Sequence, residues 1–122
     1  MQEFLIYMPT ALDEKILPSD ILQAVLYEQQ RRGLIEFDFG PIKIHKAFYD
    51  ASKEFPEIMQ HYDFTKVTNP YSATLDEMIR WHRRIGIISV QLDDKIKIID
   101  SSNLDEPSEK LQEVARYICD RI

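Results

Sequence analysis

Residues 72–99 read SATLDEMIRWHRRIGIISVQLDDKIKII. The first half places apolar side chains at helical spacing, and Gly86 is a residue type that commonly follows the end of a helix. Two β-rich runs, residues 87–92 and 95–99, then flank an acidic turn at Asp93-Asp94. The stretch therefore predicts a helix followed by a β-hairpin. The apolar stripe of that helix consists of Leu75, Met78, Ile79, His82 and Ile85.

The flanking segments complete the order helix, strand, helix, helix, strand, strand, helix. The other expected elements are a helix capped by Ser19 or Asp20 that reaches Arg32, a strand over Ile35–Phe39, a helix over Pro41–Phe55, and a C-terminal helix over Glu106–Ile122 within residues 105–122. This pattern predicts a mainly α fold with a small antiparallel β-sheet, of the α+β class. The same order is found in a winged helix, where the lone strand pairs with the hairpin.

The N-terminal residues 1–17 are expected to form an arm or a short helix. Met1–Met8 reads as a strand or arm, and a capping box at Thr10 and Asp13 favours a short helix over Ala11–Leu17. Pro, Gly and Ser do not cluster into a linker, so residues 1–122 are expected to form a single domain.

Composition narrows the location and the partners. Cys119 is the one cysteine among 122 residues, so no internal disulfide can form and the cytoplasm is the expected location. The apolar run Phe4–Met8 is far shorter than the ~20 residues of a membrane span, and Glu3 disfavours a secretory leader. The formal net charge of −6 disfavours indiscriminate binding to nucleic acid, although residues 31–97 are close to neutral.

Three motifs within residues 42–88 resemble the YwgA-like and Panacea (SocA-like) domains. The motifs are Lys43-Ile44-His45-Lys46-Ala47-Phe48-Tyr49, then Pro70-Tyr71-Ser72-Ala73-Thr74-Leu75 after the aromatic segment Tyr62–Phe64, and then Gly86-Ile87-Ile88. Asn69 stands where those families have a glycine. The resemblance implies a winged-helix-like fold of prokaryotes and their mobile elements, with mostly unknown or antitoxin- and adaptor-like roles. It implies no catalytic site.

Basic side chains on the helix of residues 72–86 and on the hairpin are the candidate nucleic-acid contacts. Arg80, Arg83 and Arg84 fall opposite the apolar stripe, where they could meet phosphates or guanine edges of DNA. The alternative is a solvated face on which Asp76 pairs with Arg80. Lys95 and Lys97 on the hairpin could contact phosphates, or could serve only to protect a sheet edge from pairing.

The remaining reactive residue types do not form a catalytic or metal-binding pattern. Glu57 and His61 have helical spacing but lack further ligands nearby in sequence, and His82 is expected as a hydrogen-bonded core or interface residue. His45 occupies the variable position of its motif. No phosphate loop or nucleophile motif is present in the sequence, so we expect neither an enzyme nor a cofactor.

Two hypotheses for the function follow. The first is a winged-helix regulator that binds double-stranded DNA as a homodimer. The second is a protein-binding adaptor or antitoxin-like module that does not bind DNA, with Trp81, Tyr117 and Cys119 as candidate partner contacts. A homodimer would form through the N-terminal arm or the C-terminal helix. DNA binding predicts a continuous positive face over helix and hairpin, whereas an adaptor predicts a mixed surface with exposed apolar residues.

Overall fold

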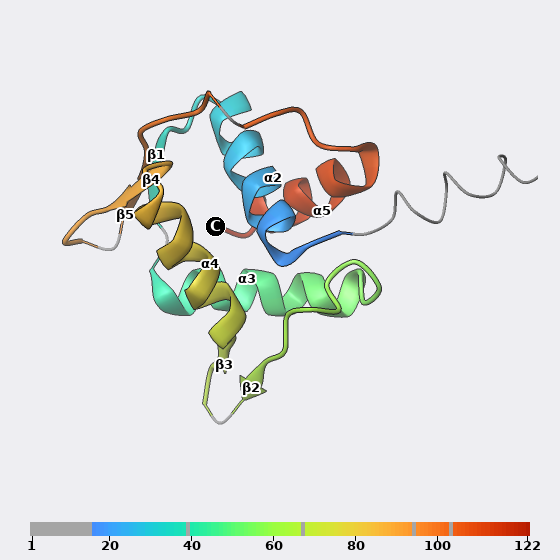
Figure 1. Ribbon diagram of the computed structural model, residues 1–122. Helices are drawn as coiled ribbons and strands as arrows, with labels where there is room; N and C mark the ends of the chain where they lie inside the picture. Colours follow the sequence, from blue (N-terminus) through green and yellow to red (C-terminus); the bar gives the residue numbers. More distant parts are fainter. Residues whose placement is uncertain (1–15, 39, 67, 94, 103) are drawn as a thin grey trace, which may run out of the picture.

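Helices are the main regular elements of the structure, which is a computed structural model that describes residues 16–38, 40–66, 68–93, 95–102 and 104–122 (Figure 1). In chain order the elements are α2 (Pro18–Arg31), β1 (Glu36–Asp38), α3 (Pro41–Glu54), β2 (Thr65–Lys66), β3 (Pro70–Tyr71), α4 (Ala73–Arg84), β4 (Ile88–Val90), β5 (Lys95–Ile98) and α5 (Glu109–Cys119). The predicted order is confirmed, with β2 and β3 as an addition. The predictions for Met1–Met8 and for residues 11–15 lie outside the described residues.

A three-stranded antiparallel sheet joins the lone strand to the hairpin. Its order is β1-β5-β4, and Phe37 of β1 faces Ile96 of β5 while Val90 of β4 faces Ile96 from the other side. The fold is thus mainly helical with a small antiparallel sheet, as predicted. The second sheet, β2 with β3, pairs Thr65 with Tyr71. The sequence suggested only an extended piece near Phe64 at that place.

Helix ends correct two details of the prediction. Leu17, which is not helical, is the N-cap of α2, and the Asp20 carboxylate accepts a hydrogen bond from its N–H at 2.9 Å. Asp20 therefore caps from inside the helix, and the short helix expected to end at Leu17 does not extend over its last two residues. The C-terminal helix begins only at Glu109, because Ser108 caps it by accepting a hydrogen bond from the Leu111 N–H.

Gly33 and Gly86 end α2 and α4 in the left-handed region, with φ of +83° and +86°. The N–H groups of Gly33 and Leu34 donate to the carbonyls of Gln30 and Gln29, which satisfies two carbonyls at the end of α2. Gly86 was expected at a helix end, and a side chain at either glycine would be strained.

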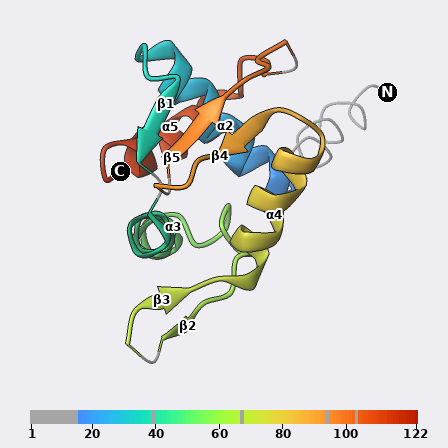
Figure 2. The ribbon, with the colours of Figure 1, turned by 90° about the vertical axis from the view of Figure 1, so that its left-hand side faces the viewer.

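The core lies between the helices and the inner face of the sheet. α2 and α5 pack side by side, and α3 and α4 cover the rest (Figures 1 and 2). Phe48, Leu75 and Ile118 from three different helices are fully buried. Ile85, predicted in the apolar stripe of α4, is 48% exposed where the chain leaves that helix. Ile35, the first residue of the predicted strand, is 51% exposed because it precedes β1 at the edge of the sheet.

An ion-pair network ties α2 to the end of α5. The buried Glu28 carboxylate accepts hydrogen bonds from Arg31 at 2.7 Å and from Arg32 at 2.8 Å, and Arg32 also donates to Asp120 at 2.8 Å. The hydrogen bond from Arg31 lowers the pKa of Glu28, against the effect of burial. The network keeps Glu28 ionised inside the fold.

Candidate functional site

The outer face of α4 carries the three arginines that were expected there. Ser72 caps the helix by accepting a hydrogen bond from the Leu75 N–H at 3.2 Å, and burial of Leu75 turns the opposite face to solvent. Arg80, Arg83 and Arg84 are exposed, and within the described ranges none of their guanidinium groups forms a hydrogen bond or ion pair. Three guanidinium groups thus remain available to an anionic partner.

Asp76 does not pair with Arg80, which corrects the alternative reading of this face. Its carboxylate accepts a hydrogen bond from the Tyr71 hydroxyl at 2.8 Å and lies 3.8 Å from Nε2 of His45. Tyr71 also stacks on the His45 ring, with the ring centroids 4.8 Å apart. The hydrogen bond to Asp76 raises the pKa of the Tyr71 hydroxyl. Asp76 is therefore engaged at the start of α4 while the arginines further along the helix stay unpaired.

His45 links α3 to the first residue before α4. The imidazole is buried, and its Nδ1 accepts a hydrogen bond from the Ser72 N–H at 2.9 Å. An accepting Nδ1 is unprotonated, so the neutral ring carries its proton on Nε2, toward Asp76. Burial lowers the pKa of His45, and the Asp76 carboxylate opposes that shift. We name His45, Tyr71, Ser72 and Asp76 the α4 clamp, because together they hold the start of this helix.

His82 is a buried residue of α4 and confirms the expectation of a hydrogen-bonded core histidine. Its Nδ1 lies 2.7 Å from the Met78 carbonyl oxygen and must therefore carry the proton. Nε2 has no hydrogen-bond partner among the described residues, and burial lowers the pKa of the ring. The geometry fits a neutral ring that carries its proton on Nδ1, and His82 lies in the core rather than on the α4 surface.

The hairpin lysines are exposed, but they do not lie on a sheet edge. β5 is the middle strand, so the proposed role of Lys95 and Lys97 in protecting an edge is wrong. Lys97 faces Glu36 in the register with β1, which places a carboxylate beside it on the outer face. The principal strand contact of α4 is with β4, so the lysines are one strand removed from the arginines.

Apolar side chains interrupt the positive surface. Trp81 is 40% exposed and borders a hollow of about 280 Å³ that is also lined by Glu77, Met78, Arg80 and Arg84. The sequence analysis named Trp81 as a candidate partner contact. The surface of α4 therefore combines cations, one aromatic ring and one free-standing carboxylate side chain.

The predicted partner contacts on the C-terminal helix are not a surface patch. Cys119 is only 5% exposed, and its thiol lies 3.6 Å from the Val25 carbonyl oxygen, so it packs against α2 and is corrected to a core residue. Burial raises the pKa of this thiol to about 12. Tyr117 is half-buried against Phe55, and the Arg121 guanidinium covers its ring at 3.6 Å from the centroid. Neither residue widens an open apolar stripe.

The α4 clamp was not predicted from the sequence, because His45 is 27 residues from Ser72 and reaches the other three members only through the packing of α3 against β3. His45 and Tyr71 lie inside the motifs of the family resemblance, which was the one signal that set them apart. Across the described ranges, no three His, Cys, Asp or Glu side chains are grouped as they would be to hold a metal ion. Likewise, no helix in the described part of the chain has the length and apolar character of a membrane span.

Comparison with known proteins adds no relative to this picture. No family model, no curated protein and no solved structure matches the chain.

Proposed function

We propose that this protein is a winged-helix-type module of the regulator kind that binds double-stranded DNA through α4. The observation that carries the proposal is the set of three exposed arginines, Arg80, Arg83 and Arg84, on one face of a helix and without a carboxylate partner among the described residues. Guanidinium groups suit both phosphate oxygens and guanine edges. The protein would act in the cytoplasm.

The order of the elements supports this type of module. The lone strand β1 pairs with β5 of the hairpin, and α4 directly precedes that hairpin. In helix-turn-helix proteins the helix in this place enters the major groove. The α4 clamp would hold the start of the helix in a fixed position. Less conformational entropy would then be lost when the helix binds DNA.

The acidic residues set the limits of the affinity. α4 carries Asp76 and Glu77 beside its three arginines, so its local excess of positive charge is small. The Asp76 carboxylate contacts Tyr71 and His45, so Glu77 is the acidic residue of α4 that would oppose an approaching phosphate most directly. We therefore expect weak binding to random duplexes and a strong dependence on salt concentration.

Fluorescence anisotropy with a labelled duplex tests the proposal. The affinity of the variant Arg80→Ala/Arg83→Ala/Arg84→Ala for the duplex is compared with that of wild type between about 50 and 200 mM salt, a range over which phosphate contacts weaken strongly. If all three arginines meet phosphates, the slope of log affinity against log salt falls by roughly 0.9 for each. A control variant, Lys53→Ala/Lys110→Ala/Arg116→Ala, removes the same charge elsewhere. Equal losses in both variants would contradict a specific role of α4.

A protein-binding adaptor or antitoxin-like module is the second candidate, and the hairpin tip favours it. Leu92 is fully exposed beside Asp93, and Trp81 is exposed on α4. An apolar side chain next to a carboxylate suits contact with a partner protein better than contact with the phosphate backbone of DNA. Capture from the native host with wild type and with Leu92→Ser/Trp81→Ala separates the candidates. The adaptor would be favoured if wild type captures a partner protein in stoichiometric amount, the variant does not, and wild type shows no duplex binding.

The oligomeric state belongs to the same proposal. A homodimer would present two copies of α4 to one duplex and raise the affinity by avidity. The burial of Cys119 against Val25 shows that this side of α5 is occupied within its own chain. A dimer through α5 would therefore use the opposite, outer side of the helix. Light scattering with and without duplex measures the state directly.

A further inference from the structure

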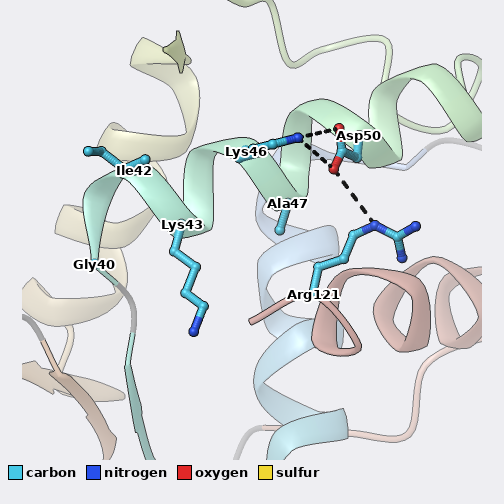
Figure 3. A pocket seen from close by; sticks show the side chains of 7 residues that line it. All are labelled: Gly40, Ile42, Lys43, Lys46, Ala47, Asp50 and Arg121. Atoms are coloured by element: carbon cyan, nitrogen blue, oxygen red, sulfur yellow. Dashed lines mark hydrogen bonds and ion pairs between the residues drawn. The ribbon is translucent and has the colours of Figure 1, made fainter.

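A groove on the side of α3 is separate from the α4 surface. It has a volume of about 550 Å³ and is lined by Gly40, Ile42, Lys43, Lys46, Ala47, Asp50 and Arg121 (Figure 3). None of these residues belongs to α4 or to the hairpin. The volume falls within the range of small-molecule sites, which are typically ~300–1,000 Å³.

The groove has an apolar floor and a cationic wall. Ala47 is buried beneath it, Ile42 is 61% exposed, and the carbon stems of the lysine and arginine side chains add further apolar surface. Lys43 extends from α3 toward the segment that carries Arg121 (Figure 3). A ligand in the groove would therefore meet carbon on one side and ammonium or guanidinium groups on the other.

The charges of the groove are unbalanced. Asp50 is the one carboxylate among the lining residues that the structure describes, and Lys46 at 3.3 Å and Arg121 at 3.8 Å share it. The Lys43 ammonium group has no hydrogen bond or ion pair anywhere in the described ranges. The first turn of α3 contains no acidic residue either, so the positive end of the helix dipole adds to the same imbalance.

We propose that this groove binds a small amphipathic carboxylate, an apolar body of aromatic or acyl type with one carboxylate group. The apolar body lies over Ala47 beside Ile42, and the carboxylate pairs with Lys43. This site is independent of DNA binding by α4, since the two share no lining residue. The excess of cations distinguishes the carboxylate from neutral or cationic compounds of the same shape.

Naphthoate is the probe, with naphthylmethanol as the neutral and naphthylmethylammonium as the cationic compound of similar shape. Titration of ¹⁵N-labelled protein is expected to shift the amides of Lys43, Lys46 and Ala47 saturably with naphthoate. Naphthylmethanol should bind at least about fivefold more weakly, the scale of one exposed ion pair. Equal affinity for the alcohol, or no saturable shift up to ~5 mM naphthoate, would overturn the proposal.

Two substitutions with opposite expected effects complete the test. Lys43→Met keeps the apolar stem and should weaken naphthoate binding about fivefold, whereas Asp50→Asn releases two cations and should strengthen it about threefold. Lys110→Met on α5 is the matched control and should change nothing. If Lys43→Met behaves like Lys110→Met, or if Asp50→Asn weakens binding, the groove does not recognise the carboxylate.

Discussion

Replacement of His45 by phenylalanine removes one hydrogen bond of the α4 clamp while it keeps a ring of similar size. The Nδ1 atom of His45 is the acceptor for the Ser72 N–H at 2.9 Å, and Ser72 is fully buried. Phenylalanine can still stack on Tyr71, but it leaves this N–H without an acceptor. A buried donor that loses its partner costs about 1–3 kcal/mol.

The assay is urea unfolding followed by the fluorescence of Trp81, with His61→Phe as the matched control on an exposed histidine. The control should stay within about 0.5 kcal/mol of wild type. Amide exchange provides a second readout, because the Ser72 N–H should exchange faster in His45→Phe. If His45→Phe is as stable as His61→Phe and Ser72 remains protected, the clamp does not hold the start of α4.

Three further predictions concern buried ionisable groups. Burial lowers the folded-state pKa of His45 and His82 below the ordinary value of 6.5, so the unfolded chain binds more protons and stability should fall as the pH drops below about 6.5. Urea midpoints at pH values roughly one unit above and below 6.5 should show the loss, and it should be smaller in His45→Phe; an unchanged midpoint would contradict this. Glu28→Gln should lose about 1–3 kcal/mol of unfolding free energy because two arginines bind the carboxylate, whereas exposed Glu113→Gln should lose almost none. The Cys119 thiol should resist a thiol reagent at mildly alkaline pH until urea unfolds the chain, because burial raises its pKa to about 12; fast labelling of the folded protein would refute its placement.

Local patterns were sufficient to predict most elements of this fold. Spacing of apolar residues identified the stripe of α4, and Gly86 marked the end of that helix. Alternation identified the strand around Phe37 and its pairing with the hairpin. These features depend on neighbours within a few residues, which is why a single sequence reveals them.

The contacts that shape the candidate site are not local. His45 meets Ser72 across 27 residues and Cys119 meets Val25 across 94, and no periodicity reports such pairs. The sequence also did not indicate which hairpin strand lies in the middle of the sheet, so Lys97 was misplaced on an edge. The exposure of Ile85 follows from the turn after α4, where helical spacing no longer applies.

The most direct test of the central claim is a titration of ¹⁵N-labelled protein with a short DNA duplex at low salt. DNA binding through α4 predicts that the largest shifts fall on the amides of Ala73–Arg84 and on the Nε signals of Arg80, Arg83 and Arg84, and that added salt reverses them. Shifts confined to α3 or to the hairpin tip at Leu92, or no shifts at any duplex concentration, would contradict the claim.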